Sequence, residues 1–141
     1  MADRVKAACV KNFAAHHDNC SGFVSAVAAD LGVTLTGTAN DITNTLRAGG
    51  AWVRLGSGPE ASAAAQAGKL VIAGLRGDEQ THPDPHGHVV VVVEGGPLAH
   101  GLYPPAFWGK LNSSGAQNET LNFAWNPQDR DRISYAAHDL A

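Results

Sequence analysis

The run from His88 to Val93 constrains the fold of this chain more than any other segment. Five consecutive valines follow one histidine, and β-branched residues of this kind favour strands. Such a strand is apolar on both faces, which is typical of a central position in a sheet. Because a polar ring begins an otherwise apolar strand, His88 is also a candidate functional residue. A buried histidine with satisfied hydrogen bonds is the simpler alternative.

A second pattern predicts a helix over residues 20–31. Apolar residues recur at spacings of three and four between residues 23 and 31, which is the pattern of one buried helix face. Asp18 and Asn19 are favourable N-cap types, and Gly32 suits the end of the helix. Cys20 is therefore expected in the first turn. Unpaired backbone N–H groups and the helix dipole there lower the pKa of a thiol.

Cys20 and His88 together indicate a cysteine hydrolase. A thiolate attacks a carbonyl carbon, and a histidine within hydrogen-bond reach accepts the thiol proton. A free cysteine is more often a small buried hydrophobe, but the residues around Cys20 are small and polar. In this hypothesis the backbone N–H of Cys20, together with a donor from Asn19 or Ser21, stabilises the oxyanion.

The residue that would orient the His88 ring stays open at this stage. If Gly95-Gly96 forms a two-residue turn, His88 pairs with Tyr103, and His100 lies on the opposite face of the sheet. A shift of one residue in this pairing would reverse the two faces. His100, Tyr103 and other residues therefore remain alternatives for this role.

Several histidines lie close together in the sequence, at His82, His86, His88 and His100. The His86 and His88 rings could lie on one side of an extended chain. A zinc-dependent amidase that uses His82, His86 and His88 is therefore a rival hypothesis. The spacing matches no strong zinc pattern, and loops between prolines often carry surface histidines. We therefore do not expect a metal site here.

The remaining patterns predict an α+β domain over residues 1–141. Further helices are expected over residues 3–15, 41–46 and 59–67, and further strands over 51–55, 69–75, 98–103, 121–125 and 132–136, with loops over 76–87 and 112–115. Since the helices precede most of the strands, N-terminal helices should pack on a mostly antiparallel sheet. A chain of 141 residues is long enough to bury a core of this kind.

Composition excludes several classes of partner. The net charge is −3 without a basic block, so nucleic acid is not an expected partner. No apolar run reaches transmembrane length, so membrane insertion is not expected. The N-terminal residues lack the apolar core of a signal peptide. We therefore expect synthesis in the cytoplasm, and any export would have to use a route that needs no cleaved leader.

The chain has two cysteines, Cys9 and Cys20. Their number alone would permit a disulfide, but that bond would consume the proposed nucleophile. Both thiols are therefore expected to be free, with Cys9 as a buried structural residue.

Four segments carry a family resemblance: DNCSGFVSAVAADLGV, GKLVIAGL, HGHVVVVV and WNPQDRDRISY. In this order they resemble the type VI secretion peptidoglycan amidase effectors, across nearly the whole chain. These are small toxins related to the NlpC/P60 branch of papain-like cysteine peptidases. The resemblance implies an NlpC/P60 (papain-like) fold in which Cys20 and His88 are the catalytic residues, without a metal or an organic cofactor.

The resemblance also implies a substrate and partners. Members of the family cleave peptidoglycan stem peptides between γ-D-glutamate and meso-diaminopimelate. They pass through the type VI secretion apparatus into the periplasm of a neighbouring cell. A cognate periplasmic immunity protein protects the producer by blocking the cleft. The alternative outside the enzymes is a non-catalytic cell-wall-binding module with an inert cysteine, which would use exposed aromatic residues such as Trp52, Trp108 and Trp125.

Overall fold

The computed structural model of the protein describes residues 2–111 and 113–141. The helices are α1 (Ala2–His16), α2 (Cys20–Asp30), α3 (Ala39–Ala48) and α4 (Gly58–Gln66). The strands are β1 (Trp52–Leu55), β2 (Leu70–Leu75), β3 (His88–Val92), β4 (Pro105–Trp108), β5 (Ala116–Thr120) and β6 (Ser134–His138). Two 3-10 helices, η1 (Gly77–Glu79) and η2 (Leu121–Phe123), complete the described elements.

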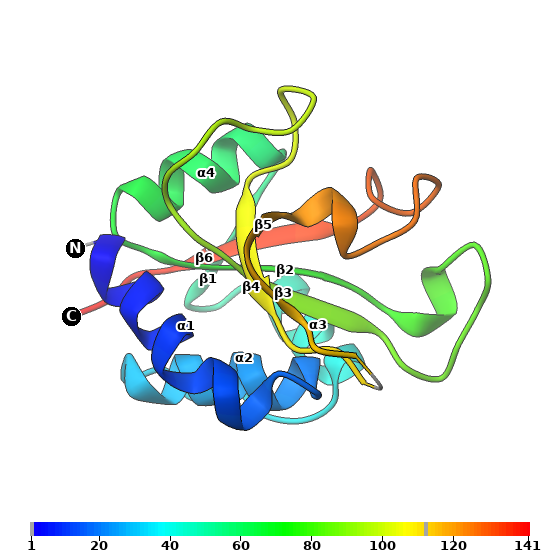
Figure 1. Ribbon diagram of the computed structural model, residues 1–141, viewed down its shortest axis with the longest axis horizontal. Helices are drawn as coiled ribbons and strands as arrows, with labels where there is room; N and C mark the ends of the chain where they lie inside the picture. The colour runs from blue at the N-terminus through cyan, green and yellow to red at the C-terminus, as the bar shows by residue number, and fades with distance from the viewer. Residues whose placement is uncertain (1, 112) are drawn as a thin grey trace.

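The strands form one sheet in the order β1-β6-β2-β3-β4-β5 (Figure 1). Every pairing is antiparallel. β3 lies between β2 and β4, and all five of its residues are buried. The structure therefore confirms the α+β class and the central position predicted for the valine-rich strand.

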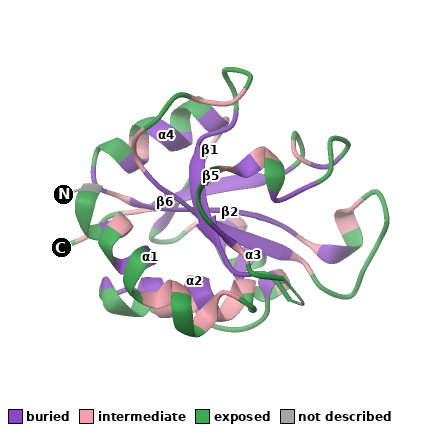
Figure 2. Cartoon of the chain, viewed as in Figure 1, coloured by how far each residue is buried: buried purple, intermediate pink, exposed green. Residues whose placement is uncertain are grey.

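The helices cover both faces of the sheet. α1, α2 and α3 lie on one side, and α4 lies on the other (Figure 1). Alternation along β3 sends Val89 and Val91 into the core beneath α1–α3, and Val90 and Val92 into the core on the α4 side. The inner strands β2, β3, β4 and β6 are buried almost throughout, while the edge strands β1 and β5 are largely exposed and the helices keep exposed outer faces (Figure 2).

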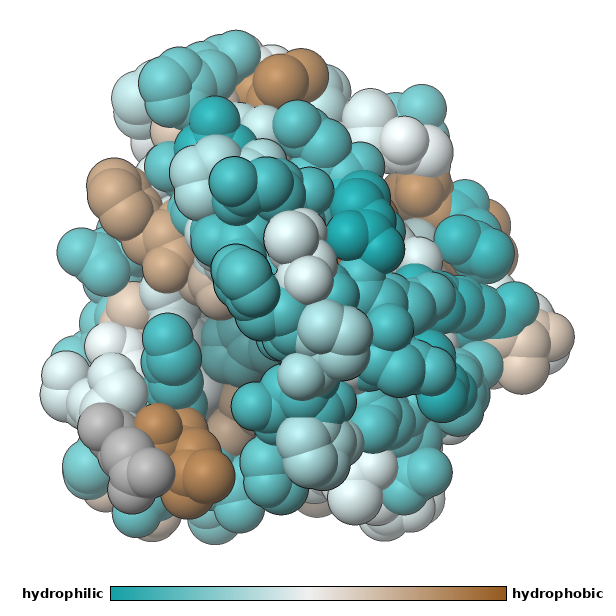
Figure 3. Space-filling view, turned by 90° about the vertical axis from the view of Figure 1, so that its right-hand side faces the viewer, coloured by the Kyte–Doolittle hydropathy of each residue, from teal (hydrophilic) through white to brown (hydrophobic). Residues whose placement is uncertain are grey.

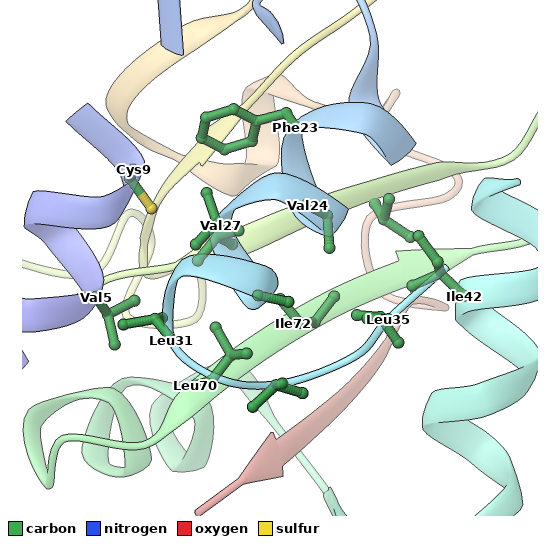
Figure 4. Close-up of a cluster of buried hydrophobic side chains, with 14 of the residues drawn as sticks. Val5, Cys9, Phe23, Val24, Val27, Leu31, Leu35, Ile42, Leu70 and Ile72 are labelled. Atoms are coloured by element: carbon green, nitrogen blue, oxygen red, sulfur yellow. The ribbon is translucent and has the colours of Figure 1, made fainter. Parts of the chain in front are cut away.

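The core under α1–α3 holds α2 against the sheet. Cys9 of α1, Phe23 and Val27 of α2, and Ile72 of β2 point into the same cluster (Figure 4). Cys9 is fully buried there, and neither Cys9 nor Cys20 is in a disulfide, as expected. This packing fixes the direction of α2 and so the position of its first residue, Cys20.

The start of α2 follows from its capping residue. Asn19 has an extended backbone (φ −146°, ψ 110°), and its side chain accepts a hydrogen bond from the N–H of Gly22. This is the N-cap arrangement that satisfies one of the otherwise unpaired N–H groups of the first turn. After the helix, Gly32 adopts φ +81°, a left-handed conformation that glycine accepts without strain.

The predicted return strand over residues 98–103 is wrong. Only one isolated bridge, between Ala99 and Tyr103, forms in this segment. His100 and Gly101 have positive φ angles of 53° and 69°, which break an extended chain. β3 pairs with β2 on one side, and its partner on the other side is β4, with Val91 opposite Phe107. Neither the two-residue turn at Gly95-Gly96 nor the pairing of His88 with Tyr103 therefore forms.

The predicted strand over residues 121–125 is also wrong, because Leu121–Phe123 forms η2. The strand in this region is β5, whose sequence AQNET is polar and mostly exposed. It lies at the edge of the sheet, where a strand need not bury one whole face. The alternation of apolar and polar residues that indicates a strand is therefore absent from its sequence. The predicted loop over 112–115 begins at residue 112, which lies outside the described residues.

The other predicted elements form with small shifts at their ends. α3 begins at Ala39 rather than at Asp41, because Thr38 is the N-cap and Asp41 completes a capping box with it. The strand predicted over 132–136 forms as β6, two residues later. No helix within the described residues combines the length and the apolar character needed to cross a membrane.

Candidate active site

A cleft of about 730 Å³ opens at the end of the sheet where β3 begins. Five segments contribute to it: the α1–α2 turn, the start of α3, the loop before β3, the residues after β4, and the segment after η2. The lining residues of these segments are 18–21, 38–40, 80 with 84–88, 110–111, and 124–126 with 129. Cys20 and His88 both lie in this lining, so the structure brings the two predicted residues to one site.

The thiol of Cys20 contacts the backbone on both sides of His88. Its Sγ lies 3.9 Å from the carbonyl oxygen of Gly87. The backbone N–H of Val89 also points to the sulfur, as do the N–H groups of Cys20 and Ser21 at the start of α2. The predicted contact between the first turn of the helix and the start of the histidine strand is therefore present.

The ring of His88 is buried against two tryptophans. Only 8% of His88 is exposed. Its ring centroid lies 5.2 Å from that of Trp125 and 6.4 Å from that of Trp108, both in edge-on arrangements. Its Nε2 is buried and has no hydrogen-bond partner among the described residues. Packing against the indoles, rather than a polar partner, therefore holds the ring.

Cys20 and His88 approach the cleft from opposite faces of the sheet. Cys20 packs against the core under α1–α3, whereas His88 contacts Trp108 and Trp125 of the core on the α4 side. Among the hydrogen bonds of the described residues, none joins the Cys20 thiol to the His88 ring.

Burial keeps both side chains neutral. Burial raises the pKa of the Cys20 thiol above its ordinary value of 9.0, although the N–H groups of Val89, Ser21 and Cys20 act in the opposite direction. Burial, together with the charge of Lys110, lowers the pKa of His88 to about 3. The site at rest therefore contains a thiol and a neutral imidazole rather than an ion pair.

Asn19 and Ser21 support the helix start. The Oδ1 of Asn19 accepts hydrogen bonds of 3.0 Å from the N–H of Gly22 and from the hydroxyl of Ser21. Because the Ser21 hydroxyl donates to Asn19, the donor that Ser21 directs at the sulfur is its backbone N–H. The oxyanion role suggested for Asn19 and Ser21 stays a prediction, with this backbone N–H as its best donor.

Neither His100 nor Tyr103 lines the cleft. The Tyr103 hydroxyl donates to Asp131, and the ring of Tyr103 lines a smaller hollow of about 170 Å³. The His100 ring packs against Tyr103 at a centroid distance of 6.1 Å. Neither residue therefore orients His88, and the sequence analysis missed the tryptophans that do. Because a ring at the start of a buried strand needs large apolar neighbours, the position of His88 in the sequence could have indicated that tryptophans pack against it.

The histidine cluster does not assemble into a metal site. Within the described residues, no three His, Cys, Asp or Glu side chains lie together in a way that could hold a metal ion. His82 and His86 are exposed in the loop before β3, whereas the His88 ring is buried against the tryptophans. The zinc hypothesis built on His82, His86 and His88 is therefore wrong.

The loop before β3 is braced by Asn40, which the sequence analysis did not identify. The Nδ2 of Asn40 donates to the carbonyl of Pro85 at 3.0 Å, and its Oδ1 accepts from the N–H of Gly77 at 2.9 Å. One side chain of α3 therefore ties together the two ends of the loop.

A second brace is Asp129, which the sequence analysis also missed. Its Oδ1 accepts from the N–H and the hydroxyl of Thr81, at 2.9 and 2.7 Å, and from Arg132 at 3.1 Å. Only 2% of Asp129 is exposed. Burial raises its pKa, but the bonds from Thr81 and the charge of Arg132 outweigh burial and lower the pKa overall.

No protein-family model matches the chain. The chain is, however, 42% identical over 128 residues to the peptidoglycan amidase Tse1 of Pseudomonas aeruginosa, across 88% of this chain and 77% of Tse1. The chain belongs to the Tse1 family of peptidoglycan amidases. Membership of this family makes the chain an enzyme, as the Cys20 and His88 pattern predicted.

The hypothesis of a non-catalytic cell-wall-binding module is not supported. It relied on exposed aromatic residues, but Trp52, Trp108 and Trp125 are each at least nine-tenths buried. Trp52 packs edge-on against His138, away from the cleft lining. All three tryptophans therefore pack in the core, which is the alternative use of these residues.

Proposed function

We propose that this enzyme is a cysteine endopeptidase that cleaves the γ-D-glutamyl–meso-diaminopimelate bond of peptidoglycan stem peptides. The observation that carries the proposal is the position of the Cys20 sulfur. It lies at the start of α2, in a large cleft, against the backbone that flanks His88. The peptidoglycan amidase Tse1, a relative across most of the chain, supports the substrate class.

In the first step His88 accepts the proton of the Cys20 thiol as the sulfur attacks the γ-glutamyl carbonyl carbon. Since both groups are neutral at rest, proton transfer accompanies attack rather than preceding it. Thiol and imidazole are not hydrogen-bonded in the free enzyme, and such bonds commonly form only when substrate is bound. The N–H groups of Cys20 and Ser21 are the donors for the oxyanion.

In the second step protonated His88 gives its proton to the amine of diaminopimelate, which leaves as the carbon–nitrogen bond breaks. The γ-glutamyl group remains on Cys20 as a thioester. Water, deprotonated by His88, then attacks the thioester carbonyl and releases a free carboxylate and the thiol. No cofactor takes part in these steps.

We further propose that the enzyme is an antibacterial toxin of the type VI secretion system, with one NlpC/P60-like (papain-like) domain over residues 1–141. It is made in the cytoplasm and acts in the periplasm of a target cell, and a cognate immunity protein guards the producer by covering the cleft. The family resemblance of the four sequence segments supports this part of the proposal. Expression in the periplasm with and without the immunity protein tests it, and harmless expression without that protein contradicts it.

Digestion of purified Gram-negative sacculi by the wild type and by Cys20→Ala tests the reaction. Mass spectrometry should find new amine termini at diaminopimelate with the wild type only. Release by both proteins would remove Cys20 from the mechanism, and release by neither would refute the substrate. A thiol alkylator should abolish the release, whereas a metal chelator should leave it unchanged.

A further inference from the structure

The charged side chains of the cleft are mostly acidic. Asp18, Asp84 and Asp129 line it, together with the imidazoles of His86 and His88. Lys110 is the one lysine or arginine among the described lining residues. The end of the molecule that carries the loop before β3 is mostly hydrophilic, with scattered hydrophobic patches (Figure 3). A single cation in such a cleft is a candidate for substrate recognition.

The backbone of Lys110 is fixed beside the nucleophile. The Lys110 N–H donates to the carbonyl of His17 at 2.8 Å. A Cβ placed on the preceding Gly109 would lie 2.3 Å from the carbonyl oxygen of His16 and 2.6 Å from that of Asn19. Glycine is therefore required for this close approach. The chain after β4 consequently rests on the turn that ends at Cys20.

The side chain of Lys110 is exposed and forms no ion pair with any residue that the structure describes. Asp129, an acidic neighbour in the cleft lining, is already bonded to Thr81 and Arg132. The ammonium charge acts on His88, because it lowers the pKa of that ring in addition to burial. An unpaired cation therefore lies within electrostatic range of the reacting groups.

Stem peptides offer an anion at a matching place. In a γ-linked glutamyl residue the α-carboxylate is free, and only a short aliphatic spacer separates it from the carbonyl carbon of the scissile bond. We infer that Lys110 binds this α-carboxylate and makes the enzyme specific for stem peptides in which it is not amidated. The inference rests on the proposed cleavage of the γ-glutamyl bond.

Two synthetic peptides test the inference: L-Ala-γ-D-Glu-meso-diaminopimelate and the same peptide with its glutamyl α-carboxylate converted to a neutral amide. The measurement is kcat/KM on each peptide for the wild type, Lys110→Met and Lys110→Glu. Lys69→Met is the matched control, since Lys69 pairs with Asp139 and precedes the end of β2 that is far from His88.

The wild type should prefer the acid peptide about tenfold, the size of effect expected for one charge pair near the protein surface. Lys110→Met should lose this preference through slower cleavage of the acid peptide, and Lys110→Glu should prefer the amide. Lys69→Met should behave as the wild type. Equal cleavage of both peptides by the wild type, or a preference kept in Lys110→Met, overturns the inference alone. Cleavage of neither peptide by the wild type refutes the proposed bond and the inference with it.

Discussion

The Sγ of Cys20 lies 3.9 Å from the carbonyl oxygen of Gly87, the residue that precedes His88. This contact joins the side chain of the first residue of α2 to the backbone of the residue just before β3, rather than to the side chain of His88. The position of the nucleophile therefore depends on the loop before β3 as well as on its own helix.

Gly87→Ala tests this dependence. A Cβ at Gly87 would lie 2.6 Å from the Oδ1 of Asn40 and 2.7 Å from the carbonyl oxygen of Leu75, so the loop must move. We expect a loss of about 1–3 kcal/mol in unfolding free energy and a loss of most of the activity. Urea unfolding and sacculus digestion measure the two effects. Gly56→Ala is the control, since the three atoms nearest to a Cβ there belong to the flexible Glu60 side chain, at 3.3 Å or more. Wild-type values for Gly87→Ala would contradict the argument.

The protonation of Cys20 predicts slow, pH-dependent alkylation. Because burial raises the pKa of Cys20 above 9.0, the thiolate fraction should grow about tenfold per pH unit between pH 6 and 8. Iodoacetamide should react at a correspondingly rising rate, as measured by intact mass. Only one thiol should react, because Cys9 is fully buried, and Cys20→Ala should not react at all. A fast rate independent of pH would show a thiolate at rest.

The contact between His88 and Trp125 predicts different results for two substitutions. Trp125→Ala removes an indole that packs 5.2 Å from the His88 ring, and should cost about 3 kcal/mol of stability and about tenfold or more in kcat through a mobile imidazole. Trp125→Phe keeps an aromatic ring, and the indole Nε1 that it removes is buried without a hydrogen-bond partner in the described structure. Its kcat should therefore stay close to that of the wild type. Equal losses in both variants would exclude a positioning role for the ring.

The lowered pKa of Asp129 predicts that the wild type and Asp129→Asn differ in stability by an amount that depends on pH. The folded pKa of Asp129 is lowered below its ordinary value of 3.8, so the stabilisation is complete above that pH and is lost as the pH falls through the folded pKa. Asp129→Asn should therefore be less stable than the wild type by about 1.5–3 kcal/mol at pH 7, and the difference should shrink near pH 3.

Urea unfolding of both proteins at the two pH values measures this difference. Asp139→Asn is the control, because the ion pair of Asp139 with Lys69 is largely exposed and contributes little. A difference between wild type and Asp129→Asn that stays constant with pH would contradict the assignment.

Lys110 also predicts a shift in the pH profile of activity. Since the pKa of His88 is about 3, the wild-type kcat/KM should not fall as the pH is lowered through 6.5, where an ordinary histidine is protonated. Lys110→Met removes one positive charge near the ring, so the pKa of His88 should rise. The acidic limb of kcat/KM should then move to higher pH, as rate measurements from about pH 3 to pH 8 would reveal. A limb near 6.5 in the wild type would contradict the burial argument.

The sequence by itself determined the local elements that carry the chemistry. The spacing of apolar residues after Cys20 and the N-cap at Asn19 specify α2, and the valines after His88 specify β3. These signals are local, because capping and side-chain periodicity act within a few residues. The family could also be recognised at this level, since its motifs include the same two residues.

Only the tertiary structure decided what surrounds the two residues. The positive φ angles at His100 and Gly101 end any strand there, so β4 replaces it and brings Trp108 to His88. The polar edge strand β5 gives no periodic signal, yet it leads to η2 and then to Trp125. Lys110 reaches the cleft because Gly109 permits close contact with the α1–α2 turn. These contacts join residues far apart in the chain, and the packing of the whole sheet, rather than any local preference, selects them.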